Sequence, residues 1–321
     1  MNMMMLDSFA EICYKPLGDS GEDAYAYDFT RSDIHAFGVF DGCGGSGAWK
    51  YPEFMNASGA FVAAQTVSKV FLDWVSGLSS ENVADADLLS SQFHTVTQQA
   101  LTRLKNSCAP MGVSGSLVKS FPCTASAALL APAEKDNLLL SALNTGDSRT
   151  YVLTPLGLTQ ITRDDSRGRP DPLDSLRDNP PLSNLLNADK EYTVKVEQVL
   201  LSTPCAVICA TDGIFGFVRS PMDFEYLLLH TLLESATLTE FEAKFKAAII
   251  ELTGDDSVCV MAFYGWGGFG KLQKSMNNRY LQMKKIIDSI DSASDAQEAD
   301  TMIRQIWDSY KQDTVFYEKQ V

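Results

Sequence analysis

The sequence is poor in histidine and has far fewer basic than acidic residues. Its 321 residues include only 3 His, and 26 Lys and Arg stand against 41 Asp and Glu, which gives a net charge of −15. A nucleic-acid-binding protein needs a basic face to neutralise phosphates, so we expect no nucleic-acid partner. Three scattered imidazoles also exclude a histidine-rich zinc site. Carboxylates are plentiful, and their oxygens are the ligands that magnesium and manganese prefer.

Long apolar runs and closely paired cysteines are missing as well. No stretch of about 18 apolar residues occurs, so we expect no transmembrane helix and no membrane partner. Residues 1–14 lack the basic start and apolar stretch of a signal peptide. The seven cysteines are dispersed, without a C-x-x-C pair, which is typical of a reduced, cytoplasmic protein whose thiols pack in the core.

The apolar pattern indicates strands and helices in a mixed order. A hairpin is predicted at 24–40, then helices at 57–75 and at about 87–107, the second with Asp87 as its N-cap. Further strands are predicted at 123–131, 137–144, 149–154, 158–162, 192–200, 205–211 and 257–264, with two helices at 222–235 and 239–252 before the last strand. Strands and helices do not alternate strictly. The order therefore predicts the α+β class, with antiparallel sheets covered by helices.

Two segments depart from this pattern. Residues 163–190 contain four prolines and are expected to form a long loop or flap. The segment after Gly270 predicts two helices joined to the rest through the glycine-rich hinge 265–270. These helices either pack on the domain as extra core or serve as a partner-binding appendage. We therefore predict a domain over 1–266 and a C-terminal helical extension over 267–321.

Acidic residues stand at the ends of strongly apolar strands. Asp41 follows one such strand and leads directly into the glycine-rich loop 42–47. The other acids at strand ends are Glu22, Asp23, Asp212, Asp255 and Asp256. One such residue is usually a turn former, but several of them brought together would repel strongly unless a cation compensated them. The pattern predicts a site for a pair of divalent cations.

The glycine-rich loop also satisfies G-x-G-x-x-G, the dinucleotide-binding fingerprint. That fingerprint requires a second parallel strand ending in an acid about 20 residues later. Here a helix is predicted in that region, and Asp41 would repel a pyrophosphate. The cation interpretation is therefore favoured. A further turn, Gly146–Arg149, joins two strands, and Arg149 is positioned to pair with one of the surplus acids.

Six segments, taken in chain order, resemble those of the metal-dependent protein serine/threonine phosphatases of type 2C, the PPM family. The chain resembles a bacterial member of that family. They are GEDAYAY, VFDGCGG, LNTGDSRTYVL, LTQITRDDS, CAVICATDGIFGFV and GDDSVCVMAF. Each segment is weak evidence alone, but six in order are specific. The resemblance implies a four-layer αββα sandwich of two antiparallel sheets flanked by helices, here followed by a C-terminal helical appendage.

The resemblance also implies the site residues and two bound manganese or magnesium ions. Its catalytic set is Asp41, Asp212 and Asp255, in which Asp41 bridges both ions. Its remaining metal-site residues are Gly42, through its backbone carbonyl, Glu22 and Asp23, through bound waters, Asp256, as the alternative to Asp255, and Asp147, at a position associated with a third ion. Whether a third ion binds stays open, because the last Asp of the family's D-G-x-x-D pattern is Gly216 here.

Other positions also depart from the family pattern. Cys43 stands where the family often has a His that acts as general acid, and Asp165 replaces the His of L-T-x-D-H-S. Cys43 is interpreted as a packing residue, which leaves water to protonate the leaving group. Gly18 replaces an Arg that holds substrate phosphate in many animal members, so that Lys15 or Arg31 would have to substitute.

The implied activity is hydrolysis of phosphoserine and phosphothreonine on proteins by a water that bridges two divalent ions. The implied partners are phosphorylated proteins and, from the family alone, a serine/threonine kinase. The alternative is a pseudophosphatase that binds phosphoproteins or a kinase as a scaffold, without turnover. Retention of the three catalytic carboxylates favours the enzyme, because an inactive site has no physical reason to keep acids that repel one another.

Overall fold

The computed structural model describes residues 6–18, 21–109, 118–168 and 170–316. Its strands are β1 (Leu6–Tyr14), β2 (Ala24–Asp28), β3 (His35–Phe40), β4 (Lys50–Tyr51), β5 (Ala57–Ser58), β6 (Ala125–Pro132), β7 (Asn137–Thr145), β8 (Arg149–Thr154), β9 (Gly157–Gln160), β10 (Lys195–Ser202), β11 (Cys205–Ala210) and β12 (Ser257–Tyr264). Its α-helices are α1 (Gly44–Gly47), α2 (Gly59–Ser76), α3 (Ala86–Ser107), α4 (Pro172–Asp178), α5 (Asp212–Phe215), α6 (Pro221–Leu233), α7 (Leu238–Leu252), α8 (Phe269–Asp291) and α9 (Ala296–Thr314).

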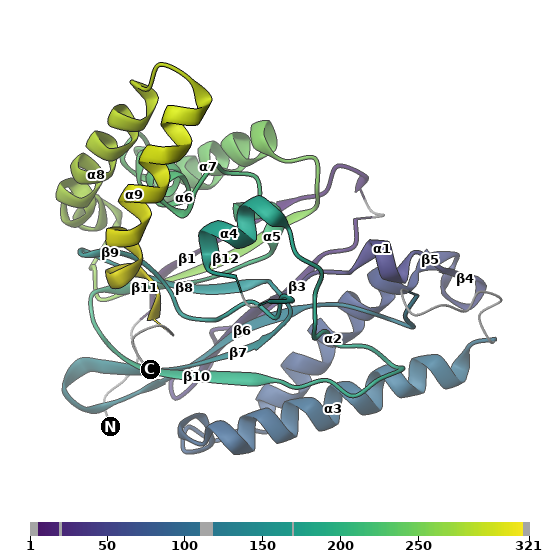
Figure 1. The fold of residues 1–321 in the computed structure, drawn as a ribbon. Coiled ribbons are helices and arrows are strands. Elements are labelled where there is room, and N and C mark those ends of the chain that lie inside the picture. Colours follow the sequence, from purple (N-terminus) through teal and green to yellow (C-terminus); the bar gives the residue numbers. More distant parts are fainter. Residues whose placement is uncertain (1–5, 19–20, 110–117, 169, 317–321) are drawn as a thin grey trace.

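Two five-stranded sheets stack face to face, and helices cover both outer faces (Figure 1). The first sheet has the order β1-β12-β11-β8-β9, and the second has the order β10-β7-β6-β3-β2. Neighbouring strands within each sheet run antiparallel. Helices α2 and α3 lie on the second sheet, whereas α6 to α9 lie over the first. The predicted α+β sandwich is confirmed.

The central strands are apolar on both faces because each face is covered. In β11 and β12 every residue is buried. Alternate residues of these strands, such as Val207 and Ile208, face the other sheet and the helices respectively. A strand covered on both faces loses the usual polar alternation, which explains the continuous apolar runs in the sequence. The acids that follow these runs are therefore held at the ends of rigid, buried strands.

The helix starts follow ordinary capping chemistry. Ser58 accepts a hydrogen bond from the Phe61 N–H of α2 (3.1 Å), and Asp85 accepts one from the Leu88 N–H of α3 (2.9 Å). The prediction that Asp87 caps α3 was wrong by two residues. Asp87 lies instead in the first helical turn, where its negative charge suits the positive end of the helix dipole.

Several elements were not predicted, and the two longest of them are β1 and α4. Strand β1 pairs with β12 along the edge of the first sheet, and only Ala10 and Ile12 of β1 are buried. Helix α4 lies inside the segment 163–190, so the expectation of a loop throughout that segment was wrong. Asp171 accepts a hydrogen bond from the Asp174 N–H (2.9 Å), and Pro172 occupies the first helical turn, which together start α4 despite the surrounding prolines.

The C-terminal helices α8 and α9 are part of the hydrophobic core. Met276 and Ile287 of α8 and Trp307 of α9 are buried in the same cluster as Leu228 of α6. The structure therefore shows the extra-core packing that we considered, and both predicted helices are confirmed. The end of the predicted extension, residues 317–321, lies outside the described residues.

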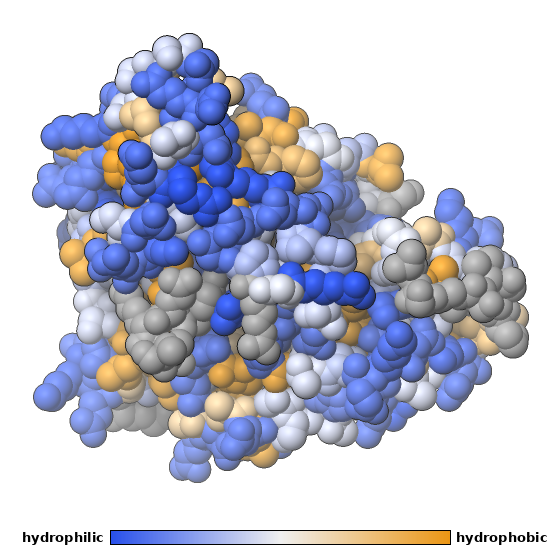
Figure 2. Space-filling view, in the orientation of Figure 1, coloured by the Kyte–Doolittle hydropathy of each residue, from blue (hydrophilic) through white to orange (hydrophobic). Residues whose placement is uncertain are grey.

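The polarity of the surface and the state of the cysteines are those that the composition predicts. The face shown in Figure 2 is largely hydrophilic, with small, separate hydrophobic areas. All seven cysteines are free, and four of them are buried. Within the described ranges, we find no helix that combines the length and the apolar character needed to cross a membrane.

Candidate active site

In the second sheet, the register of β2 and β3 places two acids side by side. Ala24 at the start of β2 pairs with Phe40 at the end of β3. The next residues outward are Asp23 and Asp41, and the charge of Asp23 contributes to the raised pKa of Asp41. The Thr124 N–H donates to the Asp41 carbonyl oxygen (2.8 Å), which fixes the start of the glycine-rich loop.

In the first sheet, β11 lies between β8 and β12. At the end of β11 the Thr211 N–H donates to the Val258 carbonyl oxygen (2.9 Å), and the Val258 N–H donates to the Thr211 hydroxyl (3.0 Å). These two hydrogen bonds place Asp212, the residue after Thr211, close to the turn that contains Asp255 and Asp256 and precedes β12. Antiparallel pairing thus delivers acids from both sheets to the same end of the sandwich.

These acids line one cleft of about 910 Å³. All eight residues predicted for the site contribute to its lining: Glu22, Asp23, Asp41, Gly42, Asp147, Asp212, Asp255 and Asp256. The segment 179–185 lines the same cleft. The structure brings the predicted residues together, and their individual roles stay predictions.

Burial and mutual repulsion raise the pKa values of these carboxyls. Burial, followed by the charge of Asp212, raises the pKa of Asp23 to about 8. Burial, followed by the charge of Asp255, raises the pKa of Asp212 to about 6. Burial is also the main cause that raises the pKa values of Asp41 and Asp147 well above the ordinary range. In the absence of a cation the cluster therefore retains protons that isolated Asp side chains would lose.

The donor chemistry of the cleft fits a hard cation. Three buried carboxylate oxygens have no hydrogen-bond partner among the described residues: Asp23 Oδ2, Asp147 Oδ1 and Asp256 Oδ1. A buried acceptor without a partner is costly, and a cation would satisfy several of these at once. Over the same described ranges, no group of three or more His, Cys, Asp or Glu side chains is already arranged so that it could hold a metal ion. The residue types and their charge suit such a cation.

Glycine is required where the backbone of the site passes other groups closely. A Cβ on Gly213 would lie 1.9 Å from the Asp256 carbonyl oxygen, and one on Gly42 would lie 2.8 Å from the Ala60 carbonyl oxygen. The dinucleotide interpretation of this loop does not fit the fold, because both neighbours of β3 run antiparallel to it.

Replacing Gly213 by Ala is expected to separate Asp212 from the turn before β12. The new methyl group has no room, so we expect a loss of about 1–3 kcal/mol in unfolding free energy and a loss of any activity that needs both acids. The matched control is Gly254→Ala, where the methyl group meets open space and should change stability by less than about 0.5 kcal/mol. Urea unfolding measures both variants, and equal stability would contradict the close packing described here.

One of the predicted cationic residues pairs as expected, and two lie outside the cleft. Arg149 donates to both oxygens of Asp164 (2.9 and 2.7 Å), so it pairs with an acid, although Asp164 does not line the cleft. Arg31 pairs with Asp33 (2.7 Å), outside the cleft. Lys15 donates to the Gly21 carbonyl oxygen (3.1 Å) and does not line the cleft.

Three other cations, Lys119, Arg167 and Lys190, line the cleft. They come from separate segments and form no motif, so only the fold could reveal them. Cys43 also lines the cleft, and burial, followed by the charge of Asp41, raises the pKa of its thiol well above the ordinary value. Its thiol therefore keeps its proton, and the interpretation of Cys43 as a packing residue stays a prediction.

No protein-family model and no curated protein matches this chain in sequence, but solved structures match its fold. Stp1 from Staphylococcus aureus, a serine/threonine phosphatase, matches with a TM-score of 0.61 and 16% identity over 83% of this chain and 98% of Stp1. The fold is that of the bacterial PPM phosphatases. PppA from Pseudomonas aeruginosa matches with a TM-score of 0.56 and 17% identity, over 82% of this chain and all of PppA.

A third PPM-fold structure carries metal. The catalytic domain of the serine/threonine phosphatase PstP, solved in complex with two manganese ions, matches with a TM-score of 0.52 and 16% identity, over 80% of this chain and 97% of its own. PstP is a protein of Mycobacterium tuberculosis. At these identities the likeness establishes the PPM fold of this chain.

Proposed function

We propose that this chain is a metal-dependent phosphatase that hydrolyses phosphoserine and phosphothreonine on proteins. The observation that carries the proposal is the convergence of carboxylates from both sheets in one cleft, several of them with raised pKa values and unpartnered oxygens. Perturbed carboxyls of this kind cluster at functional sites. A surface turn would place such acids in water instead.

The residues divide into those that would hold cations and those that would hold substrate. Asp41, Asp212 and Asp255 would be the direct carboxylate ligands of two manganese or magnesium ions. The supporting residues would be Glu22, Asp23, Gly42 and Asp256, with Asp147 near a third position. Bound divalent ions supply charge that neutralises phosphoryl oxygens and activates water. Lys119, Arg167 and Lys190 line the cleft, where they would attract the phosphate of a protein substrate.

The test is release of phosphate from a phosphothreonine peptide. We expect release in the presence of Mn²⁺ or Mg²⁺ and its loss in EDTA, with recovery when metal is restored. Activity that persists in EDTA after dialysis would exclude the metal-dependent mechanism. The same assay with a phosphotyrosine peptide as control measures the preference for phosphoserine and phosphothreonine.

A second candidate is a pseudophosphatase that binds phosphoproteins or a serine/threonine kinase without turnover. Two observations favour it: within the described residues the acids are not already arranged around a metal position, and Cys43 occupies the place of the family's general acid. Calorimetric titration with Mn²⁺ separates the two candidates. Binding near micromolar Mn²⁺ supports the enzyme, whereas absence of binding together with capture of phosphopeptides supports the scaffold.

A further inference from the structure

This chain carries more than the solved phosphatases that share its fold. They are covered over 97–100% of their own length but match only 80–83% of this chain. The remainder is about the size of the predicted extension 267–321. Helix α9, in that extension, passes directly beside α4 of the flap (Figure 1).

Polar contacts join α9 to α4 and to its capping residue Asp171. We call this line of contact between the two helices the seam. The Trp307 indole N–H donates to Asp171 Oδ2 (3.0 Å), and the Lys311 ammonium lies 3.5 Å from the same oxygen. Hydrophilic side chains gather where the two helices meet (Figure 2). Two further ion pairs complete the seam: Arg304 with Asp174 (2.6 Å) and Arg177 with Asp300.

The contacts act on the residue that starts α4. Asp171 caps the helix through the Asp174 N–H, and α9 holds the same carboxylate. Burial raises the pKa of Asp171, but the hydrogen bonds from Asp174 and Trp307 and the charge of Lys311 outweigh it and lower that pKa overall. The carboxylate is thus held in its charged form by the groups of α9.

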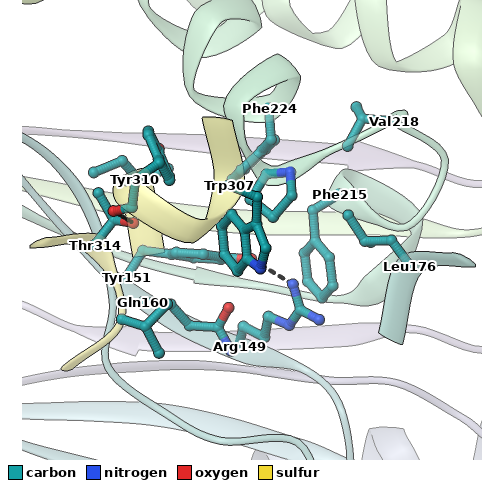
Figure 3. A pocket seen from close by; sticks show the side chains of 13 residues that line it. Arg149, Tyr151, Gln160, Leu176, Phe215, Val218, Phe224, Trp307, Tyr310 and Thr314 are labelled. Carbon is teal, nitrogen blue, oxygen red and sulfur yellow. Dashed lines mark hydrogen bonds between the residues drawn. The ribbon is translucent and has the colours of Figure 1, made fainter. Parts of the chain in front are cut away.

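Apolar side chains of the two helices also lie close together at the seam. Trp307 of α9 and Leu176 of α4 both line a cavity of about 20 Å³, together with Phe215 and Arg149 from the first sheet's side (Figure 3). Phe215 ends the short helix that begins at Asp212. Helix α9 therefore lines one cavity together with α4 of the flap and with α5, the helix that begins at the candidate catalytic residue Asp212.

The flap reaches the cleft immediately after α4. Asn179 ends the helix in a left-handed conformation (φ 40°), and the segment 179–185 that follows lines the cleft. Its far end is fixed within the phosphatase fold, because Asp165 accepts hydrogen bonds from Asn184 (2.7 Å) and from the Gly146 N–H (3.2 Å). One end of this cleft wall is therefore held by the core fold, and the other is held by α9.

We propose that α9 is a positioning element that sets the flap wall of the cleft for extended phosphoprotein substrates. The positioning residues are Asp300, Arg304, Trp307 and Lys311 of α9, acting through Asp171, Asp174 and Arg177. The proposal rests on the proposed function for its substrate class. A small phosphate ester needs only the acid cluster, whereas a phosphopeptide must also lie along the wall at 179–185.

The test reverses the charges of α9 at the seam. In the reversed variant, Asp300→Lys and Arg304→Glu meet like charges on α4. The restored variant adds Asp174→Lys and Arg177→Glu, which recreates both pairs. The matched control is Lys284→Glu with Asp288→Lys, an exposed pair on α8 that does not touch the flap. The changed residues are partly exposed where α9 meets α4, so we expect the fold to be preserved.

Two readouts follow. For the reversed variant we expect kcat/KM on a phosphothreonine peptide to fall about tenfold, mainly through KM, with kcat/KM on p-nitrophenyl phosphate changed less than about twofold. We also expect faster hydrogen exchange of the amides at 172–185. The restored variant should recover both, and the control should change neither.

Equal losses on the two substrates, or unchanged exchange at 172–185, would overturn the proposal. If the wild type hydrolyses neither substrate, the proposed function fails, yet hydrogen exchange still decides whether α9 holds the flap. Faster exchange in the reversed variant would then support the attachment, and unchanged exchange would reject it.

Discussion

Replacing Asp41 by Asn is expected to abolish manganese-dependent hydrolysis and, in the metal-free protein, to increase stability at pH 8. The first effect follows from the proposed function, in which Asp41 would help to hold the divalent cations, and we expect a loss of at least about 10²-fold, as when one essential electrostatic group is removed from an active site. The second follows because this carboxyl is already destabilised by burial and by Asp23 and Asp212. A substitution that destroys activity but stabilises the metal-free protein would show that this carboxylate serves function at the expense of stability.

The sign of the pH dependence follows from the raised pKa values. A carboxyl whose pKa is higher in the folded state, such as Asp23 at about 8, favours folding when protonated. Its stabilising contribution is complete below the unfolded pKa of about 4 and is lost as the pH rises toward 8. The metal-free wild type should therefore melt at lower temperature at pH 8 than at pH 5. Asp41→Asn should reduce this decline, because it removes one of the carboxyls whose pKa is raised by burial in the folded state.

Melting curves at both pH values, with EDTA or with Mn²⁺, measure these effects. Mn²⁺ should stabilise the wild type at pH 8 and stabilise the variant much less, because ligand binding to the folded state raises stability. The matched control is Asp33→Asn, where the Arg31 hydrogen bond lowers the pKa. It should retain activity and gain no stability. Undiminished hydrolysis in Asp41→Asn would refute the assignment of metal ligands.

The sequence predicted those features that depend on short patterns of neighbouring residues. Apolar strands that end in acids predicted both the sheets and the members of the cleft, since antiparallel pairing brings the ends of neighbouring strands together. The register of β2 with β3 is enough to place Asp23 beside Asp41. The choice between Asp255 and Asp256 stays open, because both line the cleft.

The misses have physical causes. Strand β1 buries only Ala10 and Ile12 at a sheet edge, so its alternation is short and its stabilisation comes from β12 rather than from its own sequence. Helix α4 was hidden by prolines, although Asp171 and Pro172 are a proper helix start. The partners of α9 lie more than a hundred positions away in the sequence. The cleft cations come from three separate segments. No local pattern records either arrangement.

The buried ion pair between Glu225 and Arg279 was also invisible in the sequence. The Glu225 carboxylate of α6 is fully buried and accepts two hydrogen bonds from Arg279 of α8 (2.6 and 2.7 Å). It also accepts from the Leu158 N–H (3.1 Å) and from the Tyr310 hydroxyl of α9. One carboxylate thus joins α6, both C-terminal helices and strand β9.

Replacing Arg279 by Leu is expected to destabilise the protein by about 3–5 kcal/mol, because a buried carboxylate loses its counter-charge. The matched control is Arg219→Leu. Arg219 also connects α6 to α8, through Asp223 (2.6 Å) and Asp291 (2.9 Å), but its side chain is 49% exposed. A pair exposed to that degree contributes only about 0–1 kcal/mol. Denaturant unfolding measures the free energy of unfolding of both variants. A larger loss in Arg279→Leu than in Arg219→Leu would show that burial of the ion pair, and not charge pairing alone, makes it important for stability.

The double variant Glu225→Gln with Arg279→Leu tests that cause directly. Gln removes the unpaired charge and keeps an acceptor for the Leu158 N–H, so we expect it to recover about 1–3 kcal/mol of the loss, as coupled neighbours do in double-mutant cycles. Recovery would show that the cost lies in the isolated carboxylate. If the double variant is as unstable as Arg279→Leu, the loss comes instead from the cavity left by the arginine side chain, which packs against Gly157.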